Sequence, residues 1–195
     1  VGDAQEIPPF SGTAGSHITD LYFCEFTGDL LPEIYYGRFS AQNPDLLQPQ
    51  IDKTLEYWVG FSTGFLREAG DLLDVIMIGD DLAGQSGPLF SPDFYRRIVK
   101  SRQKKIVQHI KSLTDAKVWY HTCGSCFEYI PDLIDNGIDI LNPVQIGLVN
   151  MEPAKLKEMF GSRLVFWGGG IDAQHVLPFA GPSEITEHVR KNIEI

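Results

Sequence analysis

The feature that most constrains this chain is a series of short, continuous apolar runs, each followed by a longer amphipathic segment. The four runs are 75–78, 117–120, 138–141 and 163–167. Continuous rather than alternating hydrophobicity is typical of strands that are buried on both faces of a parallel sheet. Because the connecting segments have helical periodicity, the sequence predicts an α/β fold built from right-handed β/α units.

Capping residues mark where the connecting helices begin and end. Ser91 followed by Pro92 predicts the start of a long helix, and Asn136–Gly137 predicts the end of a second helix that begins near Ser125. Two more helices are expected over 153–160 and from 181 to the end of the chain. A helical pattern also covers 46–69.

A single domain over residues 1–195 accounts for the length, since 43% hydrophobic residues can fill one sizeable core. Residues 1–70 are expected to be mostly helix and loop, and residues 70–195 to form four β/α units. Four units are about half of an eight-stranded barrel, which needs about 250 residues. The sheet is therefore either open or part of a larger barrel.

Composition excludes several classes of function. The net charge of −10, from 26 acidic and 16 basic residues, disfavours nucleic-acid binding. The longest apolar runs fall far short of the roughly 20 residues that span a bilayer, so we expect no membrane segment. Three cysteines, Cys24, Cys123 and Cys126, do not form a disulfide framework, and this favours a reducing, cytoplasmic location.

Polar residues follow each predicted strand, at the sheet edge where α/β proteins place their sites. His121 and Cys123 form the strongest combination, because residues i and i+2 of an extended segment point to the same side. An imidazole and a thiolate together suit zinc. Candidates for a third ligand are Cys126, Asp80 or Asp81, or a residue beyond Ile195.

Each of these residues also has another interpretation. His121 could simply cap its strand while Cys123 fills space as a small apolar residue. The pair Cys123 and Cys126 also matches a redox C-x-x-C motif whose first thiol lies at a helix N-terminus, an interpretation that ranks below zinc because it gives His121 no role.

The other strand ends carry weaker signals. At most one of Asp80 and Asp81 is expected to act as a ligand, general base or proton donor, and both could equally be turn residues. Gly168 and Gly169 could bring main-chain N–H groups to an anionic ligand or form a tight turn. The aromatic residues Trp119, Phe166 and Trp167 are predicted to lie in the core.

Four ordered segments resemble the uroporphyrinogen decarboxylase superfamily. They are Gly79–Gln85 with the following Gly-Pro-Leu and Ser-Pro, then His121–Ser125, Gly137–Gln145 and Phe166–Gln174. The resemblance covers residues 70–195 well and the first 70 poorly. It implies a TIM-type (β/α)8 barrel, of which this chain would be an incomplete C-terminal portion.

The resemblance also implies an activity. Members include decarboxylases that act on a porphyrinogen without a cofactor, and zinc-dependent methyltransferases whose His-x-Cys-Gly motif, here His121 to Gly124, supplies two metal ligands. Asn142, Gln145, Gly168 and Gly169 are then expected to line the cofactor or substrate site. In the methyltransferases the methyl group passes between a small methyl donor or thiol and a corrinoid carried by a partner protein.

Chemistry favours the methyltransferase branch. A substrate with several carboxylates calls for Arg or Lys, and none of the predicted strand ends carries one. We therefore expect a zinc-dependent, corrinoid-linked methyltransferase with His121 and Cys123 as ligands and Asp80 or Asp81 as a catalytic polar partner. A porphyrinogen decarboxylase is the first alternative, and a non-catalytic barrel that binds a small molecule is the second.

Overall fold

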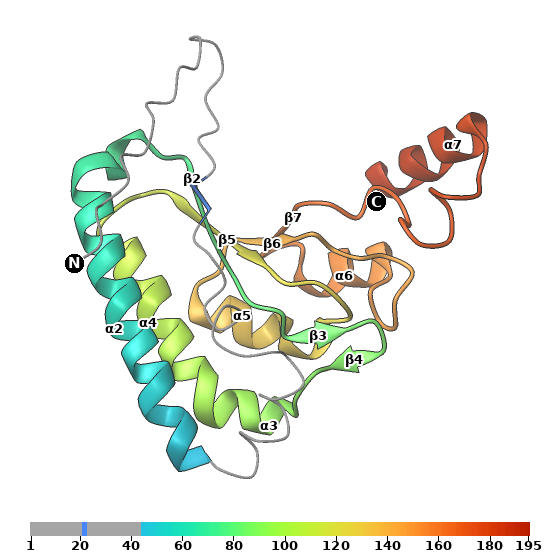
Figure 1. The fold of residues 1–195 in the computed structure, drawn as a ribbon. Coiled ribbons are helices and arrows are strands. Elements are labelled where there is room, and N and C mark those ends of the chain that lie inside the picture. The colour runs from blue at the N-terminus through green and yellow to red at the C-terminus, as the bar shows by residue number, and fades with distance from the viewer. Residues whose placement is uncertain (1–20, 23–43) are drawn as a thin grey trace, which may run out of the picture.

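The computed structural model describes residues 21–22 and 44–195, and its main feature is a five-stranded parallel sheet (Figure 1). The strands are β1 (Leu21–Tyr22), β2 (Val75–Gly79), β5 (Lys117–His121), β6 (Ile140–Asn142) and β7 (Val165–Phe166). They lie side by side in chain order, all parallel. A doubly wound open sheet would reverse its strand order at a switch point, whereas this order is that of a barrel wall. The predicted fold class, part of a TIM-type β/α barrel, is confirmed.

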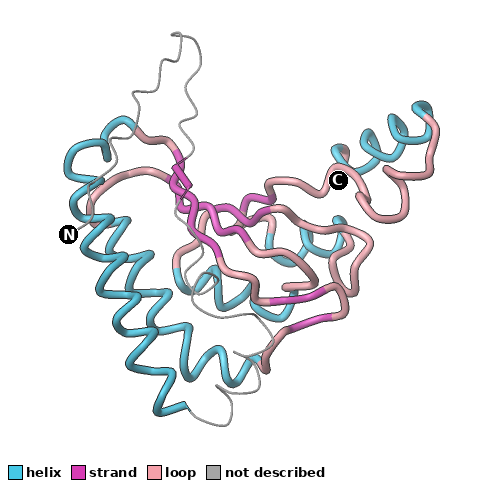
Figure 2. The backbone as a smooth tube through the Cα atoms, viewed as in Figure 1, coloured by secondary structure: helices cyan, strands magenta, loops and turns pink. Residues whose placement is uncertain are grey.

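Helices connect the strands (Figures 1 and 2). The helical elements are α2 (Pro44–Ala69), η1 (Gly70–Leu72), α3 (Pro92–Phe94), the π-helical segment η2 (Tyr95–Val99), α4 (Lys100–Lys111), η3 (Phe127–Tyr129), α5 (Ile130–Asn136), α6 (Pro153–Phe160) and α7 (Pro182–Ile193). A short antiparallel ribbon of β3 (Ala83–Gly84) and β4 (Gly87–Pro88) follows β2.

The predicted helix ends agree with the structure. The Ser91 hydroxyl accepts a hydrogen bond from the Phe94 N–H, which is an N-cap. Gly137 ends α5 with a left-handed φ of 99°. Two strands are shorter than predicted, because β6 begins only at Ile140 and β7 is limited to two residues.

The pairing register divides the strand residues between the two faces of the sheet. Ile76, Val118 and Leu141 are completely buried and belong to one core with residues of α4, α5 and α6. Trp119 is in register with Met77 and Ile140 on the opposite face. In a barrel the helices lie outside, so this opposite face is the inner wall.

One layer higher on the inner wall, the register aligns Gly79, His121 and Asn142. Trp167 follows β7, and its N–H bonds to the Leu141 carbonyl, which extends the layer to the fourth strand. This layer lies at the carboxyl edge of the sheet. The expectation that Trp167 is a core residue is wrong, because 37% of it is exposed, whereas Trp119 is 8% exposed.

A buried polar network lies behind the sheet. Gln103 of α4 accepts a hydrogen bond from the Tyr95 hydroxyl and donates one, of 2.7 Å, to the Tyr120 hydroxyl of β5. Asn136 of α5 donates to both Tyr95 and Gln103. Burial raises the pKa of the Tyr120 hydroxyl well above its ordinary value. The network fixes β5 against its two covering helices.

The N-terminal part is described only in places. Helix α2 agrees with the predicted helical pattern over 46–69, while the rest of the predicted helix and loop region falls on 1–20 and 23–43, outside the described residues. Within the described ranges, no helix combines the length and apolarity that a transmembrane segment requires.

Candidate functional site

The structure places the side chains of His121 and Cys123 next to each other at the carboxyl end of β5. The distance from His121 Nε2 to Cys123 Sγ is 3.7 Å, and both residues are partly exposed. This arrangement follows from the local sequence, since residues two apart in an extended segment share a face. The intervening Thr122 points the other way and is buried, and its hydroxyl accepts the Leu82 N–H at 3.1 Å.

Asn142 determines which nitrogen of His121 carries the proton. Its Nδ2 donates to the Trp167 carbonyl at 3.0 Å, so its Oδ1 is the atom that lies 2.7 Å from His121 Nδ1. An amide oxygen can only accept, and Nδ1 is therefore the protonated nitrogen. In the neutral ring this leaves the lone pair on Nε2, the atom that faces Cys123.

The main chain around Cys123 is held from both sides. On one side, the Asp81 Oδ1 accepts the Cys123 N–H at 3.1 Å. On the other, the Gln145 side-chain oxygen accepts the Gly124 N–H. The next N–H, from Ser125, bonds to the Gly84 carbonyl at 2.8 Å. The loop that carries the sulfur is thus fixed by segments that follow β2 and β6.

Gly124 makes this loop geometrically possible. Its φ is +84°, and a Cβ there would lie 2.4 Å from the Ala83 carbonyl oxygen. An L-residue would meet both a left-handed backbone and a main-chain clash. The Gly after Cys123 is therefore a requirement of the fold that positions the thiol.

The pair has the geometry that a shared zinc ion requires. Bond lengths of about 2.0–2.1 Å to nitrogen and 2.3 Å to sulfur at a tetrahedral angle place the two ligand atoms about 3.6 Å apart. The observed separation is 3.7 Å. No third His, Cys, Asp or Glu joins them into a three-ligand cluster within the part of the chain that the structure describes. The described residues therefore fit zinc as a pair of ligands.

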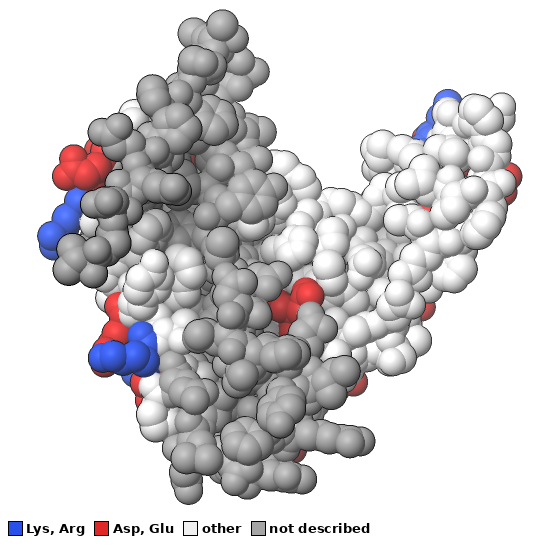
Figure 3. Space-filling model, viewed as in Figure 1, with Lys and Arg blue, Asp and Glu red and all other residues white. Residues whose placement is uncertain are grey.

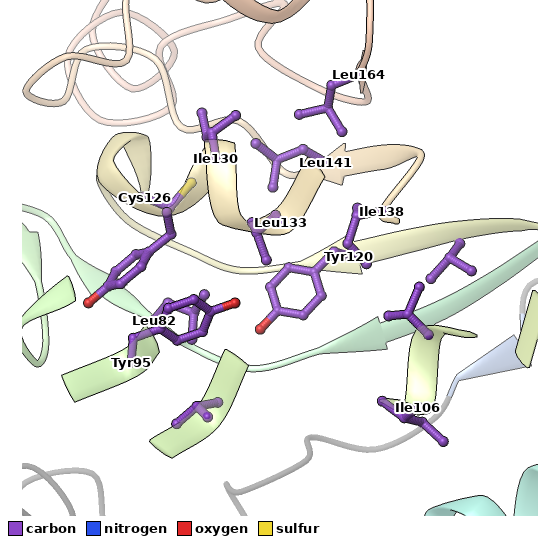
Figure 4. Packing of buried hydrophobic residues seen from close by; sticks show 14 of the residues in the cluster. Leu82, Tyr95, Ile106, Tyr120, Cys126, Ile130, Leu133, Ile138, Leu141 and Leu164 are labelled. Atoms are coloured by element: carbon purple, nitrogen blue, oxygen red, sulfur yellow. The ribbon is translucent and has the colours of Figure 1, made fainter. Parts of the chain in front are cut away.

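Cys126, the further candidate ligand, is not brought to the pair. It is 1% exposed and belongs to the apolar core, where Figure 4 shows its sulfur among buried side chains. Burial raises the pKa of its thiol to about 12. The neutral, enclosed thiol is a poor metal ligand and a poor redox partner, which argues against the C-x-x-C interpretation.

The two neighbouring aspartates, Asp80 and Asp81, have different environments. Asp81 is partly exposed and holds the Cys123 main chain, whereas Asp80 is buried. The Asp80 N–H extends the β2–β5 ladder by bonding to the His121 carbonyl at 3.0 Å. Asp81 is thus in position to fix the ligand loop, and a direct catalytic role for either residue stays a prediction.

Packing explains the glycines after β7. Gly168 has φ +122°, and a Cβ there would lie 1.8 Å from the Pro143 carbonyl oxygen. Gly169, with φ +74°, packs against Val144 and Ile146. The two glycines allow the loops after β6 and β7 to touch, and their contact with a cofactor stays a prediction.

A second polar cluster lies at the loop after β7. Asp172 pairs with His175 at 3.0 Å, and its N–H bonds to His188 Nε2 at 3.3 Å. Burial raises the pKa of Asp172, but N–H groups of His175 and Gln174 outweigh it and lower that pKa below its ordinary value. The carboxylate oxygens are already used by these local donors, so the cluster is structural.

Sequence reasoning missed the role of Trp167. Its indole stacks on that of Trp119 with ring centroids 4.7 Å apart and an interplanar angle of 12°. The position of Trp167 beside Trp119 follows from the strand register. Register depends on pairing between segments that are distant in the sequence, so no local pattern indicates it.

Comparison with known proteins identifies a family. The family model described as uroporphyrinogen decarboxylase (URO-D) matches residues 35–195. Among solved structures, a methyltransferase from Methanosarcina mazei aligns with 85% of this chain and 54% of its own, at 22% identity and a TM-score of 0.49. The chain thus spans about half the length of that structure.

A short local match concerns an unrelated kind of protein. Over 57 residues the chain is 42% identical to Lys-gingipain of Porphyromonas gingivalis, which is 29% of this chain and 3% of the gingipain. Lys-gingipain W83 from that organism matches with the same identity over the same number of residues. Because so little of either protein is covered, we transfer no property of the gingipains.

Proposed function

Because this chain belongs to the uroporphyrinogen decarboxylase family, we propose that it is a member in which His121 and Cys123 hold a zinc ion for methyl transfer. The methyl group would pass between a small methyl donor or thiol and a corrinoid on a partner protein. The observation that supports the proposal is the 3.7 Å approach of His121 Nε2 to Cys123 Sγ at the carboxyl edge of the barrel wall.

Zinc held there would supply Lewis acidity, which makes a bound thiol a thiolate or helps an oxygen leave. The protein's part is to fix the two ligands before the metal arrives. Asn142 holds the proton on His121 Nδ1 and so leaves Nε2 for coordination. Asp81 and Gln145 hold the main chain on each side of the sulfur.

The charges at the strand ends support methyl transfer over porphyrinogen decarboxylation. Among the described residues, the segments that follow β2, β5, β6 and β7 at this edge are 79–82, 121–126, 142–151 and 167–175, and they contain no Lys or Arg. A tetrapyrrole with several carboxylates needs such cations, since a carboxylate leaves water at a high cost unless it is paired. Asp80 and Asp81 would add repulsion.

The test combines metal binding with turnover. We expect the purified chain to bind one zinc ion, and His121→Ala and Cys123→Ser to lower zinc affinity at least about 100-fold. His175→Ala is the matched control, because it removes an exposed imidazole from the second polar cluster. Turnover is followed by mixing the protein with a methylated corrinoid and a thiol and recording the absorbance of the methylated corrinoid. Loss of this absorbance that requires zinc, His121 and Cys123 would support the activity.

The opposite results are equally clear. Zinc affinity unchanged in both ligand variants would contradict the proposed centre. If the metal-free protein released carbon dioxide from a porphyrinogen, decarboxylation would replace methyl transfer as the proposed activity.

A further inference from the structure

The stacked indoles of Trp119 and Trp167 form the floor beside the His121–Cys123 pair. Trp119 lies two residues before His121 on the same face of β5, about 6.5–7 Å below it. Trp167 follows β7, whose main chain is two strands and about 10 Å from that of β5. Because the ring centroids are 4.7 Å apart, one or both of the two indoles must lean over β6.

Hydrogen bonds tie this floor to the metal-binding pair. Asn142 donates to the Trp167 carbonyl and accepts from the His121 ring, so one side chain links the indole's main chain to the imidazole. Trp167 as a whole residue is 37% exposed, whereas Trp119 is 8% exposed. Trp119 is therefore the enclosed member of the stack and Trp167 the partly exposed one.

Trp119 contributes its ring to the stack and no hydrogen bond from its indole N–H. The Trp119 Nε1 is buried and has no hydrogen-bond partner among the described residues. Burying an N–H without a partner is unfavourable, a cost that phenylalanine would not have. Indole does, however, have the aromatic face that attracts cations most strongly.

The charged residues near the two tryptophans also favour a cationic ligand. Asp81 lies beside the pair, and the described loops directly after β2, β5, β6 and β7 contain no Lys or Arg. On the face shown in Figure 3, acidic side chains lie near the centre as well as at the edges, while the visible basic side chains lie at the left side and the upper right end. An anion would be repelled here, and a compact cation would be attracted.

We propose that the outer face of Trp167 binds a methylated onium group, a quaternary ammonium or a sulfonium, next to the His121–Cys123 pair. An aromatic face recognises such cations, and the Asp81 carboxylate beside Cys123 adds a favourable charge to the same group of loops. The inference rests on the proposed function, because it names the substrate class that would present its methyl group at that pair.

Binding measured by calorimetry on the 195-residue chain tests this inference. The probes are choline, its uncharged carbon isostere 3,3-dimethylbutan-1-ol, and trimethylsulfonium. We expect choline to bind about five- to tenfold more tightly than the isostere. Trimethylsulfonium bound as well as choline would show recognition of any methylated cation, and choline bound alone would narrow the class to ammonium.

Variants of Trp167 distinguish loss of its aromatic ring from loss of folding. Trp167→Leu should abolish the preference for the cation, and Trp167→Phe should keep part of it, since a weaker aromatic face remains. Trp58→Phe, in the distant helix α2, is the control and should change nothing. If Trp167→Leu fails to fold, as judged by circular dichroism, the reduced preference of Trp167→Phe decides.

Equal binding of choline and its isostere, or a preference that survives in the folded Trp167 variants, would overturn the inference. Zinc affinity measured on the same samples separates it from the proposed function. Zinc bound without any cation preference would remove only the onium site, and cation preference without zinc binding would remove only the metal centre.

Discussion

The two faces of β5 give neighbouring residues opposite roles. On the inner wall, Trp119 and His121 lead to Cys123, which is partly exposed and 3.7 Å from the imidazole. On the helix-covered face, Tyr120 is completely enclosed and bonded to Gln103. The chain then turns at Gly124 and buries Cys126 in the same core as Tyr120 (Figure 4).

The difference shows that residue type and spacing do not by themselves decide chemistry. Cys123 and Cys126 are three residues apart, yet one faces an imidazole and the other faces apolar side chains. What separates them is the alternation of the strand and the left-handed turn that follows it. Four variants or measurements can break this contrast or make it sharper.

The largest effect concerns the reactivity of Cys126. Burial raises the pKa of its thiol to about 12, so at pH 8 its reactive thiolate is roughly 1000-fold scarcer than in an ordinary cysteine. In a Cys24→Ser background, we expect Ellman's reagent to modify Cys126 only after unfolding. Thiol release against time, with and without denaturant, measures this.

The variants Cys24→Ser/Cys123→Ser and Cys24→Ser/Cys126→Ser identify which sulfur reacts. Fast release from the folded protein that lacks Cys123 would show that Cys126 is open to solvent and would remove the contrast between the two thiols.

The next largest effect concerns the turn at Gly124, which separates the partly exposed Cys123 from the buried Cys126. Gly124→Ala places a Cβ against the Ala83 carbonyl in a left-handed conformation, and we expect the free energy of unfolding to fall by about 3 kcal/mol. Gly170→Ala is the control, since a Cβ there meets no atom within 4 Å, and it should change stability by less than about 0.5 kcal/mol. Urea denaturation compares them, and equal losses would contradict the assigned role of Gly124.

Asn142 tests the inner wall alone. Asn142→Leu removes the acceptor that holds His121, and we expect zinc affinity to fall about 10- to 100-fold. Asn142→Asp still accepts from Nδ1 and should retain most of the affinity. Asn192→Ala, which removes another amide bonded to a main-chain oxygen, is the control. Competition with a chelator measures the affinities, and equal affinities for Asn142→Leu and the wild type would remove Asn142 from the site.

Tyr120 tests the opposite face and has the smallest expected effect. Tyr120→Phe leaves the buried Gln103 amide without its acceptor, and we expect the free energy of unfolding to fall by about 1 kcal/mol. Zinc affinity should not change, because the side chain points away from the pair. A large loss of zinc affinity with little loss of stability would mean that the two faces are not independent.

Local sequence signals predicted most of the fold. The apolar runs gave the strands β2, β5, β6 and β7, and caps such as Ser91 and Gly137 gave helix ends. The same signals paired His121 with Cys123, because i and i+2 spacing is a property of a single strand.

What the sequence did not predict depends on contacts between strands. Asn142 and Gln145 were expected to line the site, but only the folded chain shows that they hold His121 and Gly124. Trp167 was expected in the core, and the register instead places it on the inner wall over Trp119. Register is set by the whole sheet, so no local pattern reports it.

X-ray absorption at the zinc edge tests the central claim most directly, that one imidazole and one thiolate of this strand bind the same ion. We predict a sulfur neighbour at about 2.3 Å together with nitrogen at about 2.0–2.1 Å. The sulfur signal should disappear in Cys123→Ser and persist in Cys126→Ser. Zinc surrounded only by oxygen and nitrogen in the unaltered protein, or sulfur scattering that survives the loss of Cys123, would contradict the account.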